Sequence, residues 1–314
     1  MTKSQEVGAA VESALIGTRS MDGGWSAVGT APSDTESTAW AVMALRERTG
    51  QAAAAAAEGR QWLLENQLSE GAWPVWPSVP QPGWTTALAV IALVEAGASP
   101  TAAAVRGGRW LLGVRGRRTS WLSRVFTRLG WSTPAADLDH SLTGWPWVPG
   151  TFSWVEPTSW AVLALRSLVG SIPDGERRSR TDEAIALLID RACVSGGWNY
   201  GNRTVLGRDL WPYPDTTAIA LLALSGASGD AVVGAGVEAL AEMLGAPSSR
   251  LTLALGTLAL QAQGHEVDAV RERLAEAWST EEEHFAPTTR ARALTLLALS
   301  GSPWPVFEPV SEEA

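Results

Sequence analysis

The chain has 314 residues, with 24 Lys and Arg against 33 Asp and Glu, which gives a formal net charge of −9. This balance excludes nucleic acid as the main partner, because phosphate backbones are bound by basic surfaces. The single Cys excludes an intrachain disulfide framework and a Cys-rich zinc site. Trp supplies 17 residues against 4 Phe and 2 Tyr, so Trp is the aromatic residue to follow along the chain.

Six amphipathic helices with one polar face each are predicted in chain order. They cover residues 4–16, 52–66, 101–112, 181–193, 231–244 and 267–278. Between them lie six shorter, Ala-rich helices that are apolar on every side. Their last residues are Leu45, Leu93, Leu165, Leu224, Leu260 and Leu299. Because a helix of a soluble protein that is apolar all round must be buried all round, these six form an inner layer.

The alternation of six outer and six inner helices predicts an all-α fold, an (α/α)6 barrel or toroid. We expect one domain over residues 1–314, with an insertion at about 113–155. The alternative is a helical solenoid, which keeps the same helix pairs but does not close into a ring.

The turns from outer to inner helices carry Gly and Trp, at Gly23-Gly24-Trp25, Gly71-Ala72-Trp73, Gly144-Trp145 and Gly196-Gly197-Trp198. Together with the Gln61-Trp62 pair and the Thr-Ala-rich inner helices, such as Tyr213 to Leu224, they resemble the prenyltransferase and squalene-hopene cyclase repeat superfamily. The resemblance runs over about residues 21–301. It implies an (α/α)6 barrel that holds isoprenoid chains, without assigning a reaction.

The protein prenyltransferases of this superfamily bind zinc through an Asp, a Cys two residues later and a distant His. The positions that match hold Asp209, Trp211 and Ala291 in this chain. We therefore expect no metal site here, and the sequence indicates no other cofactor.

The cyclases of the superfamily carry an Asp-x-Asp-Asp motif before a Thr-Ala pair, and its middle Asp protonates an alkene or epoxide. The stretch from Asp34 to Ala39, Asp-Thr-Glu-Ser-Thr-Ala, is the nearest match and puts Glu36 in the place of that acid. The same register puts Glu156 and Asp215 there in the third and fourth repeats. The candidate catalytic residues are therefore Asp34, Glu36, Glu156 and Asp215.

The position nine residues before the terminal Leu lies in the first turn of each inner helix. In chain order it is occupied by Glu36, Trp84, Glu156, Asp215, Leu251 and Arg290. In a closed ring, the acids would form one arc of a mouth, and Arg250, Arg290 and Arg292 would form a basic arc that could hold a diphosphate. Carboxyl groups in an apolar pocket have raised pKa values and can donate a proton. The simpler interpretation is that these acids favour the helix dipole and that the Arg side chains are solvated.

Aromatic side chains would line such a cavity and stabilise a carbocation through their ring faces. The candidates are Trp40, Trp84, Trp145, Trp147, Trp154, Trp160, Trp198, Trp211 and Tyr213. For most Trp residues, packing between helices is the alternative interpretation.

The insertion contains a basic amphipathic stretch at residues 120–129, from Ser120 to Leu129. Its apolar stripe with Trp and Phe suits either a peripheral membrane contact or a lid on the barrel. Residues 1–17 do not read as a signal peptide, and no apolar run reaches the about 18 residues of a spanning helix. We expect a cytoplasmic protein that can associate with a membrane surface.

The leading hypothesis is a toroid that binds an isoprenoid or other apolar small molecule and acts on it as a terpene-cyclase-like enzyme through acid-initiated carbocation chemistry. A non-catalytic toroid that binds lipid or protein is the first alternative. A zinc-independent prenyltransferase is the second. A cyclase site could also require a partner chain to complete it.

Overall fold

The computed structural model describes residues 2–29, 31–94, 100–118, 138–139, 141–227, 229–280 and 287–301. Six helices of this part of the chain form an outer layer: α1 (Lys3–Gly17), α3 (Gln51–Glu65), α5 (Ala102–Gly113), α8 (Asp174–Asp190), α10 (Ala231–Gly245) and α12 (Asp268–Thr280). Six form an inner layer: α2 (Thr35–Leu45), α4 (Thr85–Leu93), α7 (Val155–Arg166), α9 (Pro214–Ala223), α11 (Arg250–Ala262) and α13 (Thr289–Leu299). A short antiparallel hairpin, β1 (Thr204–Val205) and β2 (Arg208–Asp209), precedes α9.

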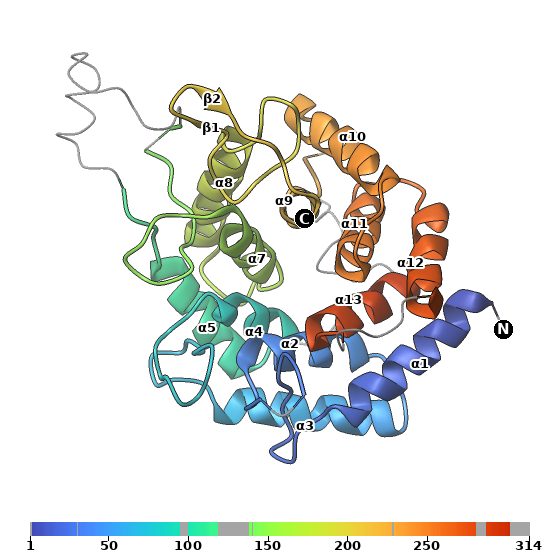
Figure 1. The fold of residues 1–314 in the computed structure, drawn as a ribbon. Helices are drawn as coiled ribbons and strands as arrows, with labels where there is room; N and C mark the ends of the chain where they lie inside the picture. The colour runs from blue at the N-terminus through green and yellow to red at the C-terminus, as the bar shows by residue number, and fades with distance from the viewer. Residues whose placement is uncertain are drawn as a thin grey trace.

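The inner helices form a closed ring (Figure 1). Each contacts the next one along the chain, and the last, α13, contacts the first, α2. The outer helices surround this ring, and α1 lies beside both α12 and α13. The all-α toroid is thereby confirmed, and closure between α13 and α2 excludes the open solenoid.

Backbone hydrogen bonds between neighbouring repeats recur around one end of the ring. The first residue of an inner helix donates its N–H to a carbonyl oxygen two residues after the turn Trp of the next repeat. Thr35 donates to Val75 at 3.0 Å and Val155 donates to Tyr200 at 3.0 Å. The same bond joins Thr289 to Ala27 at 3.1 Å across the seam between the last and first repeats. The seam therefore has the geometry of an ordinary repeat boundary.

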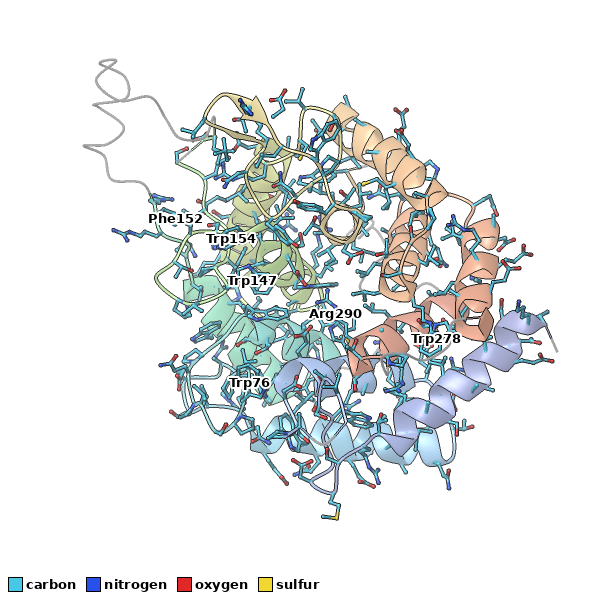
Figure 2. All side chains as sticks on the ribbon, in the orientation of Figure 1. Trp76, Trp147, Phe152, Trp154, Trp278 and Arg290 are labelled. Atoms are coloured by element: carbon cyan, nitrogen blue, oxygen red, sulfur yellow. The ribbon has the colours of Figure 1, made fainter. Side chains whose placement is uncertain are left out.

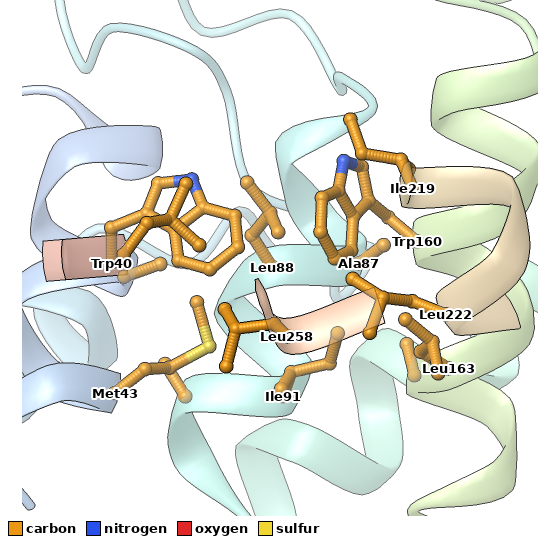
Figure 3. Packing of buried hydrophobic residues seen from close by; sticks show 14 of the residues in the cluster. Trp40, Met43, Ala87, Leu88, Ile91, Trp160, Leu163, Ile219, Leu222 and Leu258 are labelled. Atoms are coloured by element: carbon orange, nitrogen blue, oxygen red, sulfur yellow. The ribbon is translucent and has the colours of Figure 1, made fainter. Parts of the chain in front are cut away.

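Side chains fill the middle of the inner ring. Figure 3 shows Leu88, Ile91, Leu163, Leu222 and Leu258, from four different inner helices, packed among their neighbours. Their exposed fractions are 0–3%. Because these side chains are shielded from water on every side, the predicted interior cavity is not open at this level of the ring.

The turn Trp residues join the outer and inner layers. The four junction tryptophans, Trp25, Trp73, Trp145 and Trp198, each donate the indole N–H to a carbonyl oxygen at the end of the preceding outer helix, at 2.6–3.0 Å. Their backbone N–H groups donate to the hydroxyls of Thr38, Thr86, Thr158 and Thr217, in the first turn of the following inner helix, at 2.9–3.0 Å. Each indole therefore fixes the angle between two helices with two buried hydrogen bonds.

The next outer helix closes three of these junctions with a Gly. A Cβ on Gly59, Gly107 or Gly236 would lie 2.4–2.8 Å from the Cζ3 atom of the junction tryptophan. The helix backbone therefore packs directly on the indole ring, because no side chain stands between them.

At the remaining junction, the guanidinium of Arg180 in α8 lies 4.1 Å from the ring centroid of Trp145. Arg180 also donates to the carbonyl oxygens of Thr143 and Val114. Burial lowers its pKa to about 10. This explains why the predicted start of the fourth outer helix, at residue 181, is wrong: α8 begins at Asp174 because buried Arg side chains occupy inward positions where the apolar pattern was expected.

Candidate functional site at the mouth of the ring

The mouth is the end of the ring at which the inner helices begin. Glu36, Glu156, Asp215 and Arg290 are each the second residue of an inner helix. The nine-residue register therefore places all four at one level of the mouth. Figure 2 shows Arg290 toward the middle of the ring.

Arg290 binds two of the predicted acids. Its Nη1 lies 3.2 Å from Oε1 of Glu36, and its Nη2 lies 2.9 Å from Oε1 of Glu156. Glu36 is on α2, the ring neighbour of α13, whereas Glu156 is on α7, three helices away in either direction round the ring. Arg290 therefore spans the mouth. The separate basic arc predicted from the sequence is wrong at this residue, because ring closure puts the sixth repeat against the first.

Two fully buried indoles adjoin this charge cluster. Trp160 donates its Nε1–H to Oε1 of Glu156 at 3.3 Å. Its ring meets that of Trp40 edge to face, with centroids 5.1 Å apart. The guanidinium carbon of Arg290 lies 6.0 Å from the Trp40 ring centroid. The Nε1 of Trp40 is buried without a hydrogen-bond partner, which is uncommon for an indole and leaves a donor available at the site.

The charges of the cluster are unequal: two carboxylates face one guanidinium. Burial raises the pKa of Glu36; Arg290 opposes this increase, while the carboxylates of Glu156 and Asp34 add to it. Burial also disfavours the charged form of Arg290, but Glu156 and Glu36 outweigh that effect and raise its pKa. Arg290 therefore stays charged, and Glu36 is a carboxyl that holds its proton above the usual pH.

Asp34 has a structural role as the N-cap of α2. Its Oδ1 accepts from the backbone N–H of Ser37 at 2.7 Å, and its Oδ2 accepts from the Ser37 hydroxyl at 2.8 Å. Burial raises its pKa in spite of these hydrogen bonds. Both oxygens are engaged in starting the helix, so Asp34 is the least available of the predicted acids.

Asp215 is held by a residue that the sequence analysis did not name. Its Oδ1 accepts a hydrogen bond from the Thr252 hydroxyl of α11 at 2.7 Å. The only sequence signal for Thr252 is its place in the first turn of an inner helix, where hydroxyls recur in the other repeats. Asp215 also contributes to the field at Arg290. It is therefore the third carboxylate of the mouth, outside direct contact with the guanidinium.

The predicted diphosphate-binding arginines do not come together. Arg250 is buried with its guanidinium 4.3 Å from the ring centroid of Trp278 on α12, and it donates to the Ala277 carbonyl oxygen at 3.3 Å. Arg292 lies two residues beyond Arg290 on α13, and helix positions two apart face different directions. Arg290 already binds two carboxylates, so these contacts give the predicted diphosphate site no support.

Trp84, Trp147 and Trp154 are half-buried beside the mouth. The rings of Trp84 and Trp147 meet edge to face, with centroids 4.8 Å apart. A cavity bounded by Trp84, Trp145 and Pro157 has a volume of only about 10 Å³. That volume suits one water molecule and is too small for an isoprenoid.

The other predicted aromatic residues divide into two groups. Trp145 and Trp198, with exposed fractions of 3% and 0%, are junction tryptophans, and we assign them a structural role in place of the predicted substrate contact. Trp211 and Tyr213, in the loop before α9, are exposed at 77% and 48%.

Cys193 lies between the end of α8 and the turn at Gly196-Gly197-Trp198. It is buried, and its Sγ accepts a hydrogen bond from Asn199 Nδ2 at 3.4 Å. Burial raises the pKa of this thiol, which makes it a poor nucleophile. Among the described residues, no three His, Cys, Asp or Glu side chains gather in the manner of metal ligands.

The predicted membrane contact at residues 120–129 lies outside the described residues. None of the helices that are described combines the length and apolar character needed to cross a membrane.

Comparisons with known proteins bear on the fold. No family model matches the chain, and a search of curated proteins finds no match either. Among solved structures, a protein from Actinoplanes is similar at a TM-score of 0.58 and 15% identity over 95% of this chain and 98% of that one. The type II terpene cyclase MstE from Scytonema is similar at a TM-score of 0.59 and 16% identity, with the same coverage.

A variant of MstE in complex with its product, merosterolic acid A, also has a TM-score of 0.59, at 18% identity over 95% of this chain and 96% of that one. These identities are low, so the likeness concerns the fold. This chain has the all-α toroid fold that the type II terpene cyclase MstE also has.

Proposed function

We propose that this chain binds an isoprenoid at the mouth of the ring and protonates one of its double bonds, as a terpene-cyclase-like enzyme. The observation that carries the proposal is the sharing of one guanidinium, that of Arg290, between the carboxyl groups of Glu36 and Glu156. One positive charge cannot neutralise two carboxylates in a partly buried site. The cluster therefore favours a proton on one of them.

The hydrogen bonds of the two carboxyl groups support Glu36, whose pKa burial raises, as the proton donor. Oε1 of Glu156 accepts from Arg290 at 2.9 Å and from Trp160 at 3.3 Å. Glu36 has only the longer contact with Arg290, at 3.2 Å, and its side chain is 26% exposed against 11% for Glu156. The carboxyl that is less well stabilised as an anion, and more accessible, is the one that suits a proton donor.

In the proposed step, the electron pair of an alkene forms a C–H bond with the proton of Glu36 while the O–H bond of the carboxyl breaks. The products are a carbocation and the Glu36 carboxylate, which shares Arg290 with Glu156 and stays next to the cation as its counter-ion. The π-electrons of a second double bond of the substrate then form a C–C bond to the cationic carbon, which closes a ring and moves the positive charge to another carbon. The last cation loses a proton, which restores the Glu36 carboxyl through solvent or directly, or it captures water and releases the proton of that water. Trp40 and Trp160 lie next to the cluster with ring faces that attract a developing cation.

A non-catalytic toroid is favoured by one observation, the filling of the ring interior by buried side chains such as Ile91 and Leu222. In that case, the ion pairs of the charge cluster would serve only to hold the inner helices together at the mouth. A zinc-independent prenyltransferase has no such support, because its arginines are dispersed.

The first experiment is mass spectrometry of lipids extracted from the purified protein, followed by incubation with isoprenoids from farnesyl to squalene length. We expect consumption of a polyene by the native chain and loss of turnover with retained binding in Glu36→Gln. Glu65→Gln, an exposed change on α3, is the matched control and should leave turnover unchanged. No bound lipid and no turnover across the series would refute the enzyme and favour the non-catalytic toroid.

A further inference from the structure

Exposed apolar side chains are concentrated around the mouth. We call the described residues 18–29, 31–34, 66–84, 114–118, 138–139, 141–154 and 191–213, which precede the first four inner helices, the mouth loops. Of the fourteen large apolar side chains that are exposed in the described residues, twelve lie in these loops. They are Met21, Val28, Trp76, Val79, Val148, Phe152, Val194, Tyr200, Leu206, Leu210, Trp211 and Tyr213. Apolar side chains scattered at random would not choose one end of the ring.

The two mouth loops before α7 and α9 carry eight of the twelve and form one surface. The N–H of Val155 donates to the Tyr200 carbonyl oxygen at 3.0 Å, which ties the second loop to the first. The rings of Tyr200 and Tyr213 lie 5.2 Å apart. Figure 2 shows Phe152 at the periphery, with Trp154 and Trp147 between it and Arg290. The surface therefore extends from the outer edge of the molecule toward the charge cluster.

The hairpin in the second of these loops ends in an apolar tip. Leu206 and Gly207, between β1 and β2, have φ values of 52° and 73°. Leu206 is the only residue other than Gly with a positive φ in the part of the chain that the structure describes, and it is 80% exposed. A Leu is unfavourable there for two reasons. The left-handed backbone region suits Gly or Asn, and exposure of an apolar side chain to water costs free energy. An apolar partner outside the chain would bury this side chain.

The charge of these two loops is opposite to that of the whole protein. Five Arg in them are exposed or half-buried, at positions 115, 117, 118, 203 and 208, whereas the exposed acids among their described residues are Asp139 and Asp209. Arg118 also pairs with Glu183 at 3.2 Å. In a chain of net charge −9, this is a local basic surface combined with Trp, Tyr and Leu. An anionic lipid surface is the partner that matches both properties.

We propose that the mouth loops before α7 and α9 bind an anionic lipid bilayer, with Leu206 and Trp211 inserted at the interface. Trp and Tyr suit that position because one end of each ring is apolar and the other is polar. A second copy of the chain suits it less well, since two copies would bring the same basic Arg side chains of this surface against each other. The proposal extends the proposed function, because an isoprenoid would reach the mouth from the same bilayer.

The test is co-sedimentation of the full chain with vesicles that contain no isoprenoid. Vesicles of phosphatidylcholine alone are compared with vesicles of equal parts phosphatidylcholine and phosphatidylglycerol, at low and high salt. We expect binding to the anionic vesicles that weakens with salt. Leu206→Asn combined with Trp211→Ser should reduce the affinity about tenfold or more, since each side chain loses burial of apolar surface. Val169→Asn removes an apolar side chain that is 49% exposed outside the mouth loops and should bind as the native chain does.

Failure to bind either vesicle would overturn the proposal, as would unchanged binding by the Leu206 and Trp211 double variant. Light scattering that shows a dimer lost in the double variant would assign the surface to a second copy instead. Failure of the proposed function has a different signature: Glu36→Gln should sediment as the native chain does, whether or not the native chain consumes an isoprenoid.

Discussion

Gly236 marks the closest approach of the outer layer to a junction tryptophan. A Cβ at this position of α10 would lie 2.4 Å from Cζ3 and 3.0 Å from Cη2 of Trp198. Carbon atoms pack at about 3.5–4.0 Å, so the indole ring or the helix would have to move by about 1 Å. Trp198 cannot retreat easily, because it is fully buried and its Nε1–H donates to the Leu188 carbonyl oxygen at 2.6 Å.

The expected size of the effect follows from two opposing contributions. Replacing Gly by Ala inside a helix favours folding by about 1 kcal/mol. Overpacking of a core costs about 1–3 kcal/mol, and the fixed ring favours the upper end. Gly236→Ala should therefore lower the free energy of unfolding by about 1–2 kcal/mol. Gly234→Ala, two residues earlier in the same helix, meets nothing within 4 Å and should raise it by about 0.5–1 kcal/mol.

Urea unfolding, followed by circular dichroism and Trp fluorescence, measures both variants against the native chain. Adding Trp198→Leu to Gly236→Ala should make the Ala less costly than it is beside the native indole, because the clash is removed. If Gly236→Ala and Gly234→Ala shift the midpoint in the same direction, the close packing of helix on indole is not what holds this junction.

Three further changes test the cluster and the junctions. Because burial raises the pKa of Glu36, its protonated form adds stability below the ordinary pKa of 4.5, and this stability is lost as pH rises through the raised value. Glu36→Gln should remove this loss of stability with rising pH, measured by thermal unfolding. A pH dependence equal to that of the native chain would contradict the reasoning. Thr86→Val takes the acceptor from the buried N–H of Trp73 and should cost about 1–3 kcal/mol in urea unfolding, whereas Thr86→Ser should cost less. Arg250→Met removes the cation from the Trp278 ring and should cost about 1 kcal/mol; a fully stable variant would show that the stacking contributes nothing.

The ring could be predicted from the sequence because burial of the inner helices requires the apolar repeat pattern. An inner helix has neighbours on all sides, so each one must be apolar all round, and this holds from Leu45 to Leu299. The helix junctions also have a signal in the sequence, which is the spacing between each Trp and its Thr partner. Trp25, Trp73 and Trp145 each precede their Thr partner by thirteen residues, a constant spacing that indicates a fixed turn and not a ligand contact.

The charge cluster could not be predicted in the same way. The register shows that Glu36, Glu156 and Arg290 share one level, but it does not show which helices are neighbours in space. The partnership of Arg290 with Glu36 depends on ring closure, and its reach to Glu156 depends on the length of the Arg side chain. The nature of the mouth loops was also hidden, since an exposed Leu206 and a buried Leu look alike in a sequence.

The closure of the ring also fixes when the site can exist during folding. Arg290 is 254 residues from Glu36 and 134 from Glu156 along the chain. Contacts of such separation form late, because a long loop must be closed before they contribute. On a ribosome, the face of α2 that contacts α13 in the closed ring has no partner until α13 has been synthesised. The nascent chain therefore carries the carboxyl groups of Glu36 and Glu156 without their shared counter-ion, and the charge cluster is complete only when synthesis has reached α13.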